Sequence, residues 1–217
     1  MYIADLHIHS RYSRATSRDL TPEQLDFQAR KKGIRLLGTG DFTHPAWREE
    51  LKEKLIPAED GLYRLREDCV LSPEAGGEEE RTRFVVSGEI SSIYKQDRKV
   101  RKVHSLILLP GLEEAEKLSA RLEAIGNIHS DGRPILGLSC HDLLEIMLET
   151  CPEGMFIPAH IWTPHFSMFG ALSGFERAEE CFGELTPYIH AVETGLSSDP
   201  PMNWQLSCLL YTSDAAD

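Results

Sequence analysis

The chain has 217 residues, 41% of them hydrophobic and 27% charged, with a formal net charge of −12. This composition excludes a disordered or collagen-like chain, and no apolar run is long enough to span a membrane. The acidic balance argues against nucleic-acid binding by the whole surface, but a local basic patch or bound cations could reverse the sign at one site. Five scattered cysteines and an N-terminus without a signal sequence are typical of a cytoplasmic protein.

The first elements follow a strand–helix–strand order. Residues 2–8 predict a strand, and a helix follows from its N-cap Thr21 to its stop at Gly33, with a second strand over 34–37. This order indicates a parallel α/β arrangement. The next segments predict a helix over 47–55 and a mobile loop over 72–83.

The rest of the chain continues with strands and helices. The pattern predicts strands over 84–89, 103–109, 156–160 and 189–193, helices over 112–125 and 141–149, and a strand or loop over 135–138. Several of these strands end in His, Asp or Glu, which is typical of the C-terminal face of a barrel enzyme.

A chelating pair of histidines is the strongest local signal. His7 and His9 are two residues apart, so on a strand both side chains point to the same side, and Asp5 shares that face. Chance alone produces many such pairs, but a strand end with a flanking acid favours a metal site.

Further candidate ligands stand at other strand ends. They are Asp41 after the Gly38–Gly40 turn, Glu89, His104 and His160. Each one alone has an ordinary explanation as a helix cap or a solvated residue. Together with His7 and His9 they form the donor set of a zinc or manganese site.

These motifs resemble the PHP (polymerase and histidinol phosphatase) superfamily of metal-dependent phosphoesterases. The strings DLHIHS, GTGD, GEI, VHSLI and PAH carry the likeness. Longer strings, such as PAHIWTPHFSMFGALSGF and AVETGLSSDPPMNW, resemble the branch that contains endonuclease Q, whose members are often labelled UvrD-like helicase. The chain has no GxxxxGK[ST] string to bind ATP, which argues against that label.

The resemblance implies a distorted (β/α)7 TIM-like barrel with two or three divalent cations, either zinc, manganese or magnesium. It implies that His7 and His9 bind one cation, that Glu89 bridges it to a second, and that His104 and His160 complete the second site. Asp41 stands where the family has the ligand of a third cation. Arg11 and Arg14 follow the histidine pair and are expected, with Glu89, to act on the substrate phosphate.

The resemblance covers residues 1–207. The segment 208–217 does not continue the pattern of the residues before it. Members of the family continue into a strand with an Asp-x-His motif, which completes two metal sites. We therefore expect an incomplete PHP domain, truncated at its C-terminus and inactive alone, followed by an unrelated tail that is an artefact.

A basic run over residues 95–102 is a candidate contact for the DNA backbone. We expect Arg98, Lys99, Arg101 and Lys102 to bind nucleic acid, although the same charges could protect the edge of a hairpin. Trp162 and Phe166 belong to an aromatic cluster that could stack on a base, but packing is the more common role.

The resemblance implies a phosphodiesterase that nicks DNA on the 5′ side of deaminated bases during repair. Two alternatives stay open: a phosphomonoesterase acting on a small ester, and a catalytically dead module that binds metal or nucleic acid. An amidohydrolase also opens with two such histidines, but the chain shows no strand-end lysine to bridge its metals.

Overall fold

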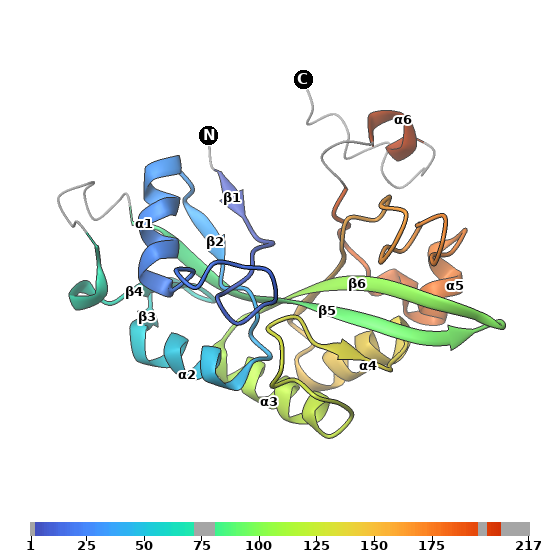
Figure 1. Cartoon of the computed structure of the whole chain (residues 1–217), viewed down its shortest axis with the longest axis horizontal. Coiled ribbons are helices and arrows are strands. Elements are labelled where there is room, and N and C mark those ends of the chain that lie inside the picture. The colour runs from blue at the N-terminus through green and yellow to red at the C-terminus, as the bar shows by residue number, and fades with distance from the viewer. Residues whose placement is uncertain (1–2, 72–80, 195–198, 205–217) are drawn as a thin grey trace.

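A curled mixed sheet, flanked by helices, forms the body of the protein (Figure 1). The computed structural model describes residues 3–71, 81–194 and 199–204. The strands are β1 (Ala4–Asp5), β2 (Leu36–Gly38), β3 (Leu55–Pro57), β4 (Tyr63–Leu65), β5 (Arg83–Gln96), β6 (Lys99–Leu109), β7 (Ile135–Leu136) and β8 (Met155–Pro158). The α-helices are α1 (Pro22–Lys32), α2 (Pro45–Lys54), α3 (Leu112–Glu123), α4 (Cys140–Thr150), α5 (Ala178–Phe182) and α6 (Asp199–Asn203), with 3-10 turns at Glu67–Cys69 and Gly183–Tyr188.

The sheet combines a parallel part with a long antiparallel hairpin. Strands β1, β2 and β5 pair in parallel, whereas β5 pairs with β6, and β6 with β8, in antiparallel fashion. The predicted α/β class is confirmed, and so is the parallel arrangement of the opening strands, whereas the later strands add antiparallel pairs. Only Asp97 and Arg98 connect β5 to β6, and both have positive φ angles (51° and 62°). A two-residue turn of this kind joins antiparallel strands, because a parallel crossover needs a far longer connection.

Local signals in the sequence explain the helices that surround the sheet. In α1 the Thr21 side chain accepts a hydrogen bond from the Gln24 N–H, and Gly33 ends the helix at a φ of 73°. In α3 the buried stripe includes Leu118 and Leu122, as predicted. Ile125 was expected on the same stripe, but the helix ends before it and its side chain is exposed.

The segment 189–193 was predicted as a strand and contains none. Glu193 still runs beside the end of β8, because its N–H donates to the Pro158 carbonyl and its carbonyl accepts from Ile161. Two such hydrogen bonds fix the position of Glu193 without extending the sheet. Most of the predicted loop over 72–83 and the predicted tail over 208–217 lie outside the described residues.

In the part of the chain that the structure describes, no helix is both long and apolar enough to cross a membrane.

Candidate metal centre

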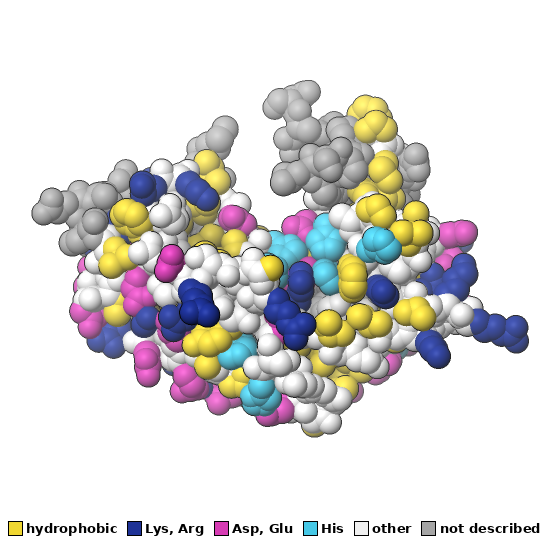
Figure 2. All heavy atoms as spheres, viewed as in Figure 1, with side chains coloured by type: hydrophobic (Ala, Val, Ile, Leu, Met, Phe, Trp, Pro, Cys, Tyr) yellow, Lys and Arg dark blue, Asp and Glu magenta, His cyan; other side chains and the backbone are white. Residues whose placement is uncertain are grey.

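Glu89 of β5 lies at the centre of four imidazole rings. Its side chain is 1% exposed, and its Oε1 lies 2.7 Å from His104 Nδ1, 3.2 Å from His160 Nε2 and 3.5 Å from His7 Nε2. Its Oε2 lies 3.5 Å from His9 Nε2. Histidine side chains gather near the middle of the face shown in Figure 2, with Lys and Arg side chains beside them.

Segments far apart in the chain supply these rings. His7 and His9 follow β1, His104 lies on β6, and His160 follows β8. In the β5–β6 register His104 pairs with Ser91, two residues beyond Glu89, so Glu89 and His104 project from the same face of the hairpin.

The donor atoms form two groups that could each hold a cation. Atoms of His7, His9 and Glu89 lie within 4.8 Å of one another, and so do atoms of Glu89, His104 and His160. Imidazole nitrogens with a shared carboxylate suit zinc, manganese and similar divalent ions, so the residues fit the cations that the PHP resemblance implies.

The His7 and His9 rings each contact a second carboxylate through Nδ1, the ring nitrogen that does not face Glu89. His7 Nδ1 lies 2.9 Å from both Glu193 oxygens, and His9 Nδ1 lies 3.0 Å from Asp41 Oδ1. Metal-binding histidines usually have such a partner, which fixes the ring and its tautomer. The expected ligand Asp41 therefore lies on the far side of His9 from Glu89, and its Oδ2 accepts hydrogen bonds from Ser10 and Ser13. Asp41 thus orients the His9 ring, and its role as the ligand of a third cation stays a prediction.

The backbone is strained at two of these residues. Asp41 has a φ of 50° and His160 a φ of 32°, a region that non-glycine residues rarely adopt. The His160 N–H donates to Glu193 Oε2 at 2.8 Å, which holds the backbone in place. Strain of this kind concentrates at functional sites.

Burial and the carboxylates shift several pKa values in opposite directions. Burial lowers the pKa of His7, but the Glu193 and Glu89 carboxylates outweigh it and raise the pKa to about 10. Burial opposes ionisation of Glu89, yet hydrogen bonds from His104, His160 and His7 hold the pKa of its carboxyl well below the ordinary range. For His104 burial prevails over Glu89 and lowers the pKa. The metal-free centre thus keeps an ionised carboxylate beside a charged His7.

The two arginines predicted to act on the phosphate each contact an acid outside the metal centre. Arg11 contacts the buried Glu50 at 2.8 Å and lies over the Tyr12 ring. Arg14, whose side chain is 76% exposed, contacts Asp131 at 3.3 Å. Neither shows a contact with the four histidines or Glu89 in the described residues, so their role at the phosphate stays a prediction.

The predicted basic run forms the far end of the β5–β6 hairpin. Arg98 and Lys99 are exposed at its turn, and Lys102 is half-buried with its amino group over the Phe166 ring. Arg101 differs from the expectation: it is only 7% exposed, donates to the Gly174 carbonyl and lies over the Phe175 ring. Its place on the covered face of the hairpin corrects its predicted role in binding nucleic acid.

Sequence reasoning missed Arg133 at the centre, and it placed Glu193 near the site only as an acid that flanks a predicted strand. Arg133 Nη1 lies 3.1 Å from Glu89 Oε2, and the Glu193 carboxylate holds both His7 and the backbone of His160. Glu193 carried a weak signal as an acid at the end of an apolar segment. Arg133 lies in an Asp-Gly-Arg-Pro turn before β7, and nothing in that string indicates a site.

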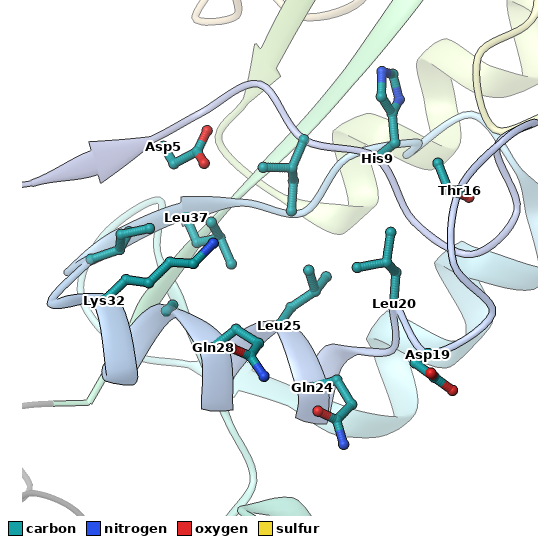
Figure 3. A pocket seen from close by; sticks show the side chains of 13 residues that line it. Asp5, His9, Thr16, Asp19, Leu20, Gln24, Leu25, Gln28, Lys32 and Leu37 are labelled. Carbon is teal, nitrogen blue, oxygen red and sulfur yellow. The ribbon is translucent and has the colours of Figure 1, made fainter.

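A cavity of about 520 Å³ lies between α1 and the segment around β1 (Figure 3). Its lining includes Ile8, Leu25 and Leu37, with Gln24 and Gln28 among its polar residues. Asp5, which was expected beside the histidine pair, also lines this cavity. The ring of His9 points away from the cavity in Figure 3, but His9 is among the residues that line it, so the cavity and the metal centre share this residue.

Uncharacterized proteins of two organisms are similar to the chain in sequence. No protein-family model matches the chain. The chain is 33% identical to the uncharacterized protein YqxK of Bacillus subtilis over an alignment of 229 residues, which covers 98% of the chain and 54% of YqxK. It is also 33% identical to the uncharacterized protein MJ0043 of Methanocaldococcus jannaschii over 174 residues, 80% of the chain and 18% of that protein. The chain spans about half of YqxK and a smaller part of MJ0043.

Solved structures are more informative about the fold. The lesion-specific endonuclease Q of Pyrococcus furiosus superimposes with a TM-score of 0.72 and 29% identity, over 90% of this chain and 42% of that one. Endonuclease Q bound to a 27-mer duplex with an abasic lesion at its active site gives a TM-score of 0.76 and 29% identity, over 94% and 45%. The chain has the fold of endonuclease Q.

A more distant structure has the same endonuclease Q-like fold. It is a Bifidobacterium adolescentis protein with a provisional assignment as a metal-dependent phosphoesterase, with a TM-score of 0.60 and 15% identity over 98% of this chain and 84% of that one. At this identity the likeness concerns the fold alone.

Proposed function

We propose that the chain provides the catalytic metal centre of a phosphodiesterase that nicks DNA on the 5′ side of deaminated bases. The observation that carries the proposal is the buried Glu89 carboxylate, shared between two groups of imidazole donors. The likeness to endonuclease Q, one structure of which holds a DNA duplex, supports a nuclease over other phosphoesterases.

The residues of the centre would have two roles: some would bind the cations, and others would orient the histidine rings. Bound divalent cations would supply a water that ionises near neutral pH and would neutralise charge on the phosphate. Glu89, His7, His9, His104 and His160 would hold these cations. Asp41 and Glu193 would keep the His9 and His7 rings oriented from behind.

The hairpin gives DNA a second point of contact. Lys99 at the turn is five residues from His104 on β6, a distance of about 17 Å at 3.4 Å per strand residue. We expect Arg98 and Lys99 to contact a backbone phosphate several nucleotides from the scissile one. Arg14 is exposed enough to contact a nearer phosphate.

A nicking assay tests this function. The complete protein, loaded in turn with Mn²⁺, Zn²⁺ or Mg²⁺, is incubated with end-labelled duplexes that carry one deoxyinosine or one uracil, and with the undamaged duplex. We expect a single nick on the 5′ side of the altered base, and none with the Glu89→Gln variant. Equal cutting of the undamaged duplex would contradict the base specificity.

Two other outcomes support the alternatives. Hydrolysis of p-nitrophenyl phosphate without nicking would indicate a phosphomonoesterase. Metal and DNA binding by the complete protein without turnover of either substrate would indicate a binding module.

A further inference from the structure

Arg133 places a guanidinium group at the metal centre. Its Nη1 lies 3.1 Å from Glu89 Oε2, the same oxygen that faces His9 Nε2. The Arg133 side chain is 37% exposed and Glu89 is 1% exposed. The arginine therefore reaches from the surface to the carboxylate that both groups of metal donors share.

The backbone around Arg133 is held on several sides. The Gly132 N–H donates to the Tyr12 carbonyl at 3.0 Å, and the Arg133 N–H donates to Asp131 Oδ1 at 3.1 Å. A Cβ atom on Gly132 would lie 2.2 Å from Asp41 Oδ2, so this position packs too tightly for a side chain. The backbone of the loop is fixed against the centre, and only the long Arg133 side chain is free to change partner.

A divalent cation and the Arg133 guanidinium group would compete for Glu89 Oε2. Once the carboxylate neutralises a divalent cation, its attraction for Arg133 falls, and the cation itself repels the arginine. A guanidinium group released at this position needs another anion. A phosphate ester offers two oxygens in the geometry that arginine binds best.

We propose that Arg133 binds the substrate phosphate: it pairs with Glu89 in the metal-free protein and turns to the phosphate oxygens when cations occupy the centre. This inference rests on the proposed phosphodiesterase function. Arg11 and Arg14 are less suited to the role, since Glu50 and Asp131 hold them away from Glu89.

Calorimetry with phenylphosphonate, a non-hydrolysable phosphate analogue, tests the proposal without any turnover. Titrations use the whole chain with and without Mn²⁺, together with the Arg133→Ala and Arg133→Lys variants. Arg18→Ala is the control, because Arg18 is an exposed arginine on the N-terminal loop that also carries Arg11 and Arg14. Circular dichroism verifies that each variant is folded.

We expect Arg133→Ala to weaken phenylphosphonate binding to the Mn²⁺-loaded chain by about 10-fold or more, with partial recovery in Arg133→Lys. Mn²⁺ binding in the absence of the analogue should be unchanged or tighter, because a competitor for Glu89 is lost. Without Mn²⁺ the wild-type chain should bind the analogue weakly.

Two results would overturn the proposal, and they are distinguishable. Normal Mn²⁺ binding with equal analogue affinity in wild type and Arg133→Ala would reduce Arg133 to a structural ion pair and leave the metal centre intact. A wild-type chain that binds no Mn²⁺, Zn²⁺ or Mg²⁺ would reject the proposed function itself, and the role of Arg133 with it.

Discussion

The two pairs of histidines around Glu89 differ in what lies behind each ring. His7 and His9 each have a carboxylate on the other ring nitrogen, from Glu193 and Asp41. His160 has the Thr163 hydroxyl in that position, and the face of His104 packs near Phe166, with ring centroids 4.8 Å apart. The first pair thus has a second carboxylate on each ring, whereas the described residues place none on the rings of the second pair.

This difference also appears in the protonation of the rings. Carboxylates raise the pKa of His7 to about 10, whereas burial lowers the pKa of His104. A negative environment attracts cations as well as protons. We therefore expect the group of His7, His9 and Glu89 to bind its cation more tightly than the group of His104 and His160, and to depend more on pH.

The largest expected effect comes from the residue that the two groups share. Glu89→Gln keeps the size of the side chain and removes the charge, so both cations should be lost, with a fall in affinity of more than about 100-fold. Equilibrium dialysis with Mn²⁺ measures this, and His104→Gln is the matched variant that should lose one cation only. Retention of one tight cation in Glu89→Gln would show that the groups are independent.

Removal of a carboxylate behind one ring should weaken the binding of one cation more than that of the other. Glu193→Gln leaves His7 without its anionic partner, and we expect the first cation to bind about 10- to 100-fold more weakly. The affinity for the second cation should fall less, because Glu193 contacts only the backbone N–H of His160 in that group, and separate Mn²⁺ binding phases would show the difference. Asp41→Asn is the parallel variant at His9, and equal weakening of both phases would contradict the distinction between the pairs.

The stability of the metal-free chain should depend on pH through His7. Its folded pKa of about 10 is above the ordinary value of 6.5, so protonated His7 stabilises the folded state fully below pH 6.5. That contribution should decline as the pH rises towards 10. Chemical unfolding of the chelator-treated chain and of His7→Gln at pH 6, 8 and 10 isolates the effect. A constant difference between the two proteins across this range would refute it.

The smallest expected effect concerns the far end of the hairpin. Arg98→Ala with Lys99→Ala removes two exposed charges, and the slope of log K against log salt for duplex DNA should become shallower by about 1.8. Metal binding should be unaffected. Lys31→Ala, an exposed lysine on α1, serves as the control, and an unchanged slope in the hairpin variant would exclude this surface from DNA binding.

Features that depend on a few consecutive residues could be predicted from the sequence. The capping residues of α1 and the spacing of His7 and His9 are both features of a few consecutive residues. Arg101 was misjudged because the strand was predicted from residue 103 onward. Since β6 begins at Lys99, the period of two places Arg101 on the same face as the buried Val103.

Long-range contacts decided the rest of the candidate site. Glu193 is 186 residues from His7, and Arg133 is 44 residues from Glu89. The residues next to Arg133 give no sign of its contact and those next to Glu193 give only a weak one, because both contacts depend on how distant segments of the chain fold together. The position of Asp41 has the same origin. The turn that carries Asp41 lies behind His9 and not beside Glu89.

Electron paramagnetic resonance of the Mn²⁺-loaded chain tests the shared carboxylate most directly. Two Mn²⁺ ions bridged by Glu89 should show a spin-coupled spectrum at two equivalents of metal, and Glu89→Gln should abolish it. A spectrum of isolated Mn²⁺ ions at full occupancy, unchanged by the substitution, would contradict a centre built around Glu89.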